Sequence, residues 1–106
     1  MKPVEFLGSS YDDLRSFPKE VRRALGLELR KVQSGEPPSD FKPMPAVGKG
    51  VYEIRVRLNG AWRLMYVARF ADAVWVLHAF QKKTQKTTKQ DLSVAQQRYR
   101  SIGGGV

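Results

Sequence analysis

The segments GVYEIRVR (residues 50–57), AWRLMYVARF (61–70) and AVWVLHAFQKKTQKT (73–87) decide the fold of this chain. In the first two, side chains alternate with the period of two that is typical of a β-strand with one covered face. The positions on one side are Tyr52, Ile54, Val56, Trp62, Leu64 and Tyr66, and those on the other are Glu53, Arg55, Arg57, Arg63, Met65 and Val67. The pattern predicts an antiparallel hairpin with one apolar and one largely ionic face.

The turn between these strands decides whether their charged side chains meet. A two-residue Asn-Gly turn would place Arg57 opposite Trp62 and mix the faces. A three-residue loop of residues 58–60, with its glycine in a left-handed conformation, pairs Arg55 with Arg63 instead. We favour the three-residue loop, because a slip of one residue would bury arginines. It predicts one cluster on the same side of the hairpin, made of Glu53, Arg55, Arg57 and Arg63.

Residues 74–81 predict a third strand after a turn at residues 70–73. Apolar side chains occupy both faces of this segment, as expected of a strand that is covered on both sides. If the turn pairs Arg69 with Val74, Met65 lies opposite His78. His78 then joins the side of the sheet that carries Glu53 and Arg63.

The first third of the chain predicts a short strand and two helices. Residues 4–7 form the strand, which Gly8 ends and which can pair with the later sheet. A brief helix over residues 11–14 ends by Phe17, because Pro18 biases the preceding residue away from helical angles. A longer helix follows over residues 19–33, with Gly35 as its stop.

The longer helix has an apolar stripe and a basic remainder. Its stripe is typical of a core-facing helix and consists of Val21, Leu25, Leu29 and Val32, with Ala24 and Leu27 widening it. Off the stripe lie Arg22, Arg23, Arg30 and Lys31. These four form either a solvated face or a surface that contacts RNA or a partner protein.

Two further segments complete the chain. Residues 34–49 contain four prolines and two glycines, which predicts a connector without regular structure. A loop of that length is either functional or a brace against the sheet edge. After the third strand, Thr88 and Asp91 form a capping pattern for a last helix, whose apolar stripe is Leu92, Ala95, Tyr99 and Ile102. The glycines at 103–105 are expected to end that helix and to fray.

Length and composition limit the possible functions. The 106 residues are expected to form a single domain over residues 1–106. Nineteen Lys and Arg against ten Asp and Glu give a formal charge of +9, which favours a polyanionic partner. Nucleic acid is the first candidate and an acidic protein the second. With no cysteine and a single histidine, we expect no metal site and no cofactor. No apolar run suits a membrane span or a signal peptide, so we expect a cytoplasmic protein with no membrane partner.

Three motifs, in this order along the chain, resemble those of the RelE/HigB superfamily of bacterial toxins. They are GVYEIR (50–55), Trp62-Arg63 with Tyr66, and VLHAFQKKT (76–84). The string LHAFQKKTQKT is characteristic of the phage-derived HigB-like branch, and the resemblance covers roughly residues 4–100. It implies an α+β, RelE-like fold, in which N-terminal helices pack on a small antiparallel sheet and a C-terminal helix follows.

The same resemblance implies a function and partners. Such toxins are metal-independent endoribonucleases that enter the ribosomal A site, cut the mRNA there and stop translation. The implied partners are therefore the mRNA, the ribosome with its rRNA, and an antitoxin encoded beside the toxin. In the HigB branch this antitoxin is a helix-turn-helix, HigA-like protein that holds the toxin inactive and represses the operon.

The chemistry of such cleavage assigns hypothetical roles to the ionic face. The ribose 2′-OH must lose a proton, the phosphate must accept a fifth oxygen, and the leaving 5′-oxygen must gain a proton. Glu53 is the candidate base, or it orients Arg63 or His78 instead. Arg63, with Arg55, is expected to hold the phosphate through its planar guanidinium.

The remaining candidates lie along the third strand and its exit. His78 has the ordinary pKa range for acid or base work, although a lone histidine in an apolar strand is often a packed core residue. Lys82 and Lys83 match the strand-exit basic residues of the family and either protonate the leaving group or hold phosphate. The residues expected to bind RNA are Arg55, Arg57, Phe80, Lys86 and Lys89, with Phe80 stacking on a base.

Two other functions compete with the toxin hypothesis. The chain is alternatively a non-catalytic nucleic-acid-binding module, whose arginines only neutralise phosphates. The other competing hypothesis is an inactive toxin homologue that pairs with a helix-turn-helix regulator. Discrete cuts near the A-site codon of mRNA on purified ribosomes would distinguish the enzyme from the binding module.

Overall fold

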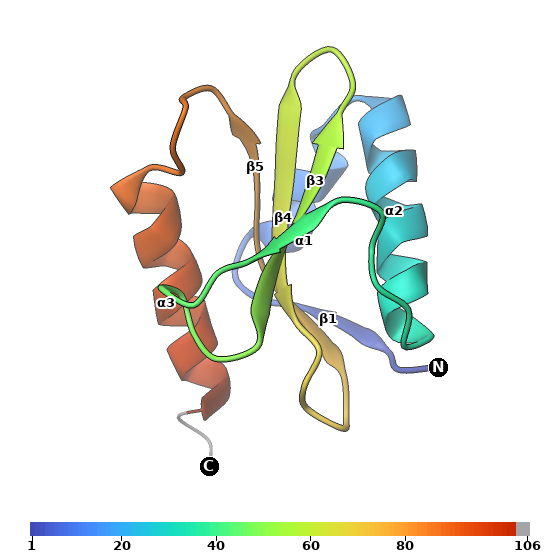
Figure 1. Cartoon of the computed structure of the whole chain (residues 1–106), viewed down its shortest axis with the longest axis vertical. Helices are drawn as coiled ribbons and strands as arrows, with labels where there is room; N and C mark the ends of the chain where they lie inside the picture. The colour runs from blue at the N-terminus through green and yellow to red at the C-terminus, as the bar shows by residue number, and fades with distance from the viewer. Residues whose placement is uncertain (104–106) are drawn as a thin grey trace.

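A mixed sheet of five strands runs through the molecule, and the computed structural model describes residues 1–103 around it (Figure 1). The strands are β1 (Val4–Phe6), β2 (Phe41–Pro43), β3 (Val51–Arg57), β4 (Ala61–Val67) and β5 (Val74–Lys82). Their order across the sheet is β1-β5-β4-β3-β2; β1 is parallel to β5, and all other neighbours are antiparallel. Three helices complete the α+β fold: α1 (Ser10–Arg15), α2 (Lys19–Gln33) and α3 (Lys89–Gly103). The predicted fold class is confirmed.

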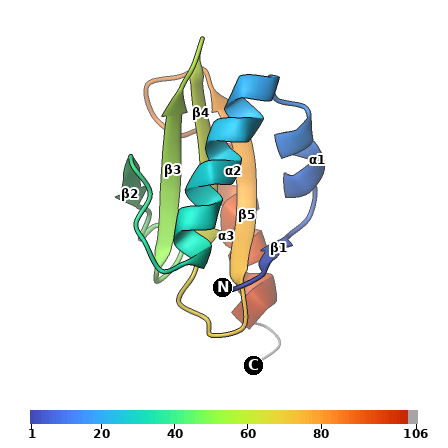
Figure 2. The same ribbon diagram turned by 90° about the vertical axis from the view of Figure 1, so that its right-hand side faces the viewer.

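The helices cover opposite faces of the sheet, with α2 on one side and α3 on the other (Figures 1 and 2). The predicted stripe of α2 packs on the apolar side chains of the hairpin, including Ile54, Leu64 and Trp62. Ala95 and its neighbours on α3 pack on Met65, which lies on the other face. Because α3 reaches only part of its face, the remainder of that face is left for polar side chains.

The hairpin has the predicted register. Arg57 pairs with Ala61 and Arg55 with Arg63, so the loop contains three residues, 58–60. Two consecutive residues of this loop have positive φ, Asn59 at 51° and Gly60 at 138°. A glycine meets this requirement without strain and asparagine tolerates it, which explains why the chain turns here without shifting the faces.

The pairing of β4 with β5 contains a β-bulge that the sequence analysis did not predict. Met65 lies opposite His78 as expected, but Tyr66 pairs with Val76, so Leu77 is an extra residue on β5. The predicted pairing of Arg69 with Val74 is therefore wrong by one residue, since the bulge changes the register on its two sides. The carbonyl of Leu77 accepts a hydrogen bond of 2.9 Å from Nη1 of Arg98 on α3. The bulge thus ties the sheet to the last helix.

The prediction that residues 34–49 lack regular structure is also wrong, because Phe41–Pro43 forms the edge strand β2. Proline is tolerated at a sheet edge, where its missing N–H need not join a ladder. The prolines of this segment led to the prediction of irregular structure, and for this reason the strand was not predicted. The connector braces the edge of the sheet, which was one of its two expected roles.

The other element predictions are confirmed with small shifts at the ends. The strand near the N-terminus pairs with β5, and α2 has the predicted bounds. The Thr88 hydroxyl accepts a hydrogen bond of 3.1 Å from the backbone N–H of Asp91, as the capping pattern predicted. The helix ends at Gly103; the expected fraying of the glycines at 104 and 105 lies outside the described residues. In the described part of the chain, no helix has the length and apolar character needed to cross a membrane.

Two leucines of α2 provide a test of the predicted core. Leu25 is fully buried against the sheet, as predicted, whereas Leu27 is 57% exposed, so the expectation that it widens the core-facing stripe is wrong. Leu25→Ala is expected to lower the free energy of unfolding by about 2–5 kcal/mol, since it leaves a cavity. Leu27→Ala, the control, should change it by about 0.5 kcal/mol or less. Urea denaturation of the two variants measures both values, and equal losses would contradict this packing.

Candidate functional site

Charged side chains gather on the face of the sheet that carries α3, in the part that the helix leaves uncovered. The pairing aligns three rows across β3, β4 and β5. The rows are Arg57-Ala61-Lys82, Arg55-Arg63-Phe80 and Glu53-Met65-His78. Six of the residues predicted to form the site therefore share one face with Arg55, although they do not all reach the same cavity.

A pocket of about 350 Å³ opens over the first two rows. Its lining consists of Arg55, Arg57, Gly60, Ala61, Arg63, Lys82, Thr84 and Gln85. Three guanidinium groups and one ammonium group surround it, and no carboxylate lines it. We call it the basic pocket. Its composition suits a phosphate group, for which guanidinium forks and ammonium groups are the usual protein ligands.

A buried ion pair joins Arg63, which lines the basic pocket, to Glu53 in the next row of the same face. Glu53 is 1% exposed and Arg63 is 2% exposed, and Nε of Arg63 lies 3.4 Å from Oε1 of Glu53. The approach lacks hydrogen-bond geometry, so this Nε has no hydrogen-bond partner among the described residues, and neither does Nε of Arg55. Buried donors left in this state are costly and tend to occur at functional sites. The ion pair fixes the side chain of Arg63. Arg63 and Arg55 each retain an N–H group that can donate to a ligand.

Mutual repulsion and burial affect the cations of this pocket. Burial lowers the pKa of Arg63; the charge of Glu53 raises it in part, and Arg55 and Arg57 lower it further. Burial also lowers the pKa of Lys82, followed by the charge of Arg63, with Glu53 acting against them. Arginine remains charged because its ordinary pKa is so high. Lys82 is therefore the lining residue whose lowered pKa bears on proton transfer, since Arg63 stays charged.

The sequence-predicted candidates separate into groups. Glu53 is buried and does not line the pocket. His78 is 8% exposed and points to α3, with Nε2 at 2.7 Å from Oδ1 of Asp91. The ring of Phe80 is also buried and stacks on His78 at a centroid distance of 4.9 Å. The lysines beyond the strand, Lys83, Lys86 and Lys89, are exposed and lie outside the lining of the pocket.

Sequence reasoning missed several residues of the site. Thr84 and Gln85 line the basic pocket, and the Thr87 hydroxyl donates to Oε2 of Glu53 at 3.5 Å. Lys42 contributes to the positive potential around Lys82, and it lies opposite Glu53 in the register of β2 and β3. The polar run at 83–88 was the available signal for the threonines. The sequence contains no comparable signal for Lys42, because its position depends on the unpredicted strand β2.

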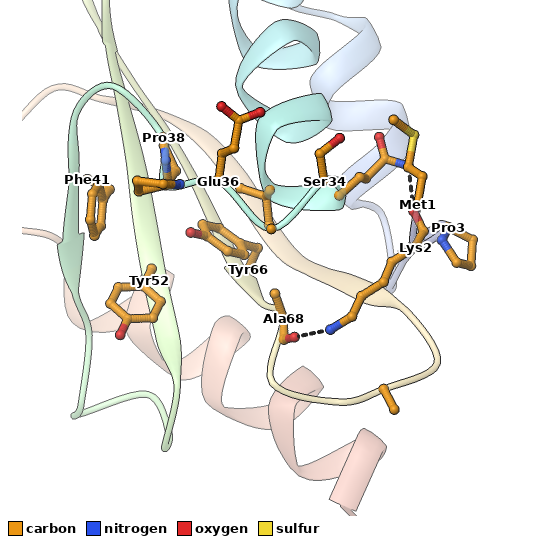
Figure 3. Close-up of a pocket in the computed structure, with 15 residues that line it drawn as sticks. Met1, Lys2, Pro3, Ser34, Glu36, Pro38, Phe41, Tyr52, Tyr66 and Ala68 are labelled. Atoms are coloured by element: carbon orange, nitrogen blue, oxygen red, sulfur yellow. Dashed lines mark hydrogen bonds between the residues drawn. The ribbon is translucent and has the colours of Figure 1, made fainter.

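A cavity of about 770 Å³, larger than the basic pocket, lies on the opposite face of the sheet (Figure 3). Phe41, Tyr52 and Tyr66 line it, and burial raises the pKa of Tyr66 to about 12. Its Lys2 donates to the backbone carbonyl of Phe70 at 2.8 Å. This cavity lacks a cluster of free cations, so the smaller basic pocket is the candidate site. Within residues 1–103, no group of three or more His, Cys, Asp and Glu side chains is arranged to hold a metal ion.

Comparison with known proteins gives one family match. The family model described as phage-derived protein Gp49-like (DUF891) matches residues 12–100. The match spans α2, all of β2 to β5 and most of α3, and so includes every residue of the basic pocket. The search of curated proteins finds no match.

Proposed function

The chain belongs to the family of phage-derived Gp49-like proteins, a RelE/HigB-like toxin-type family, and we propose that it is the toxin of a toxin-antitoxin system. Within that family we assign it to the HigB-like branch. Its activity is that of a ribosome-dependent endoribonuclease, which cuts mRNA in the A site and so inhibits translation in the cytoplasm. Its partners are the mRNA, the rRNA around the A site and a HigA-like helix-turn-helix antitoxin.

The basic pocket is the observation that carries this proposal. Arg55, Arg57, Arg63 and Lys82 converge on a volume of about 350 Å³, which is large enough for one phosphate with its two ester oxygens. The formal charge of +9 supports the same reading, because contacts with many rRNA phosphates strengthen binding. An RNA backbone placed over this face would bring one phosphate to the guanidinium groups.

The cleavage step follows from the roles of these side chains. The ribose 2′-oxygen bonds to phosphorus while the bond from phosphorus to the 5′-oxygen breaks, leaving a cyclic phosphate and a 5′-hydroxyl. Arg55 and Arg63 stabilise the charge that develops on the phosphate oxygens. The Lys82 ammonium protonates the leaving 5′-oxygen, which its lowered pKa favours.

The other candidates support this pocket in our proposal. Glu53 holds Arg63 in place rather than acting as the base, since it is buried and does not line the pocket. His78 and Phe80 stack on each other beside α3, outside the lining of the basic pocket. The exposed lysines Lys83, Lys86 and Lys89 lie on the path of the RNA beyond the cut phosphate and neutralise its charge. The proton of the 2′-OH passes to water.

The role of Lys82 predicts a pH dependence of cleavage. A general acid works only while it is protonated, so the rate should fall as the pH rises through the pKa of Lys82. Because that pKa is lowered, the fall should begin below the pH at which an ordinary lysine loses its proton. Lys82→Arg should retain phosphate binding but remove this alkaline limb and reduce the rate by about 10²-fold or more. An unchanged pH profile in Lys82→Arg would refute the assignment.

Cleavage mapping tests the proposed function. Purified ribosomes programmed with mRNA are incubated with the protein, and the 5′ ends of the products are located by primer extension. Cuts at the A-site codon, absent from untranslated transcript, are expected. Retention of mRNA or ribosomes without cuts would contradict the enzyme and favour the non-catalytic module.

A further inference from the structure

The loop of residues 83–88 forms one wall of the basic pocket, through Thr84 and Gln85. It joins β5 to α3 and is polar, with most of its side chains exposed. Few apolar contacts hold a loop of this kind, so its conformation depends on specific polar anchors. Two buried or half-buried carboxylates supply these anchors.

The stronger anchor is Asp91, in the first turn of α3. Its Oδ1 lies 2.7 Å from Nε2 of His78 on β5, and its Oδ2 accepts a hydrogen bond of 2.8 Å from the hydroxyl of Thr88. Its backbone N–H donates to the same hydroxyl at 3.1 Å. One carboxylate therefore joins the sheet, the last residue of the loop and the start of α3. Its negative charge also lies where the helix dipole stabilises it.

The second anchor is Glu53, which accepts a hydrogen bond from Thr87 at 3.5 Å on the side away from Arg63. The two anchors are adjacent in the loop, at Thr87 and Thr88. They are also connected across the sheet, because Glu53, Met65 and His78 lie in one row. The contact between Asp91 and His78, at 2.7 Å, is shorter than the contact between Glu53 and Thr87. It also fixes the position of α3.

We propose that Asp91 is a positioning residue of the basic pocket: through His78 and Thr88 it holds the 83–88 loop against the sheet, so that Thr84 and Gln85 remain on the pocket wall. This gives His78 a role in the site without contact to RNA. The inference rests on the proposed function for its link to RNA cleavage. The anchoring itself is a property of the fold and is measurable without any RNA.

Trypsin digestion of the native protein tests the anchoring. Lys83 and Lys86 lie in the loop, so the rate of cutting after them reports how often the loop opens. Asp91→Ala is expected to raise this rate by about tenfold or more, because it removes hydrogen bonds to a charged group. Asp91→Asn, whose amide accepts a hydrogen bond through its oxygen at one of the two positions and donates through its NH2 group at the other, should restore part of the protection.

A matched control distinguishes this effect from a general loss of helix capping. Asp13 occupies the first turn of α1, an element that the loop does not join, and accepts a hydrogen bond of 2.8 Å from Ser9. Asp13→Ala should leave cutting after Lys83 and Lys86 unchanged. If Asp91→Ala fails to fold, Thr88→Ala removes only a hydroxyl and should still raise the cutting rate, by a smaller factor.

Cleavage of mRNA on programmed ribosomes tests the link to the pocket. Asp91→Ala should raise KM by about tenfold and change kcat less, because the loop contacts RNA rather than the reacting atoms. Unchanged cutting by trypsin in Asp91→Ala and Thr88→Ala would refute the anchoring. Increased cutting by trypsin with unchanged KM and kcat would refute the positioning role. If the wild type cleaves no mRNA, the proposed function fails, and the trypsin result still decides the anchoring.

Discussion

Arg55→Ala is expected to reduce the rate of mRNA cleavage on the ribosome by about 10²–10³-fold, the usual loss when one stabilising donor is removed from a developing charge. Arg55 is half-buried at the wall of the basic pocket and pairs with Arg63 in register. Its removal relieves repulsion among the guanidinium groups rather than breaking an ion pair, so the protein should remain folded. Primer extension measures the rate, and induced expression should no longer stop growth.

A control variant makes this result specific. Arg22 is an exposed arginine on α2, which packs on the opposite face of the sheet. Arg22→Ala removes the same charge and should leave cleavage within about a factor of three, since only long-range attraction to RNA changes. Equal losses in both variants would mean that net charge, and not the basic pocket, determines the activity.

The sequence predicts the hairpin and its ionic face because one strong constraint acts there. A slip of one residue would bury arginines and expose Ile54 and Leu64, so the period-two pattern and the loop at 58–60 determine the register. The same reasoning fails at the bulge on β5. That strand is apolar on both faces, so its pattern contains no signal for the extra residue at Leu77.

The sequence predicts only those features of the site that depend on neighbouring strands of one hairpin. Placing Arg55 and Arg63 on one face required only the hairpin. The partners of Glu53 and His78 lie elsewhere, at Thr87 and Asp91, and depend on how the last helix docks. Burial of Glu53 also depends on that docking and on β2. Sequence alone therefore predicted which residues share a face but not which of them reach the basic pocket.

Breaking the buried ion pair is expected to have the largest effect on stability. Glu53→Leu leaves the guanidinium of Arg63 buried beside Arg55 without a counter-charge, which should lower the free energy of unfolding by about 3–5 kcal/mol. Urea denaturation measures the loss. For a domain of this size, such a loss is a large part of the total stability, so the variant should be partly unfolded at 37 °C.

The double variant Glu53→Leu/Arg63→Met separates the two roles of the pair. Replacing both charges with apolar groups of similar volume is often neutral or stabilising, so the free energy of unfolding should return to within about 1 kcal/mol of the wild type. Cleavage of mRNA should nevertheless stay at least about 10²-fold lower, since the guanidinium that faces the phosphate is gone. A stable double variant that still cleaves would show that Arg63 serves only the fold. A double variant as unstable as Glu53→Leu would show that the loss comes from packing around Glu53 and not from an uncompensated charge.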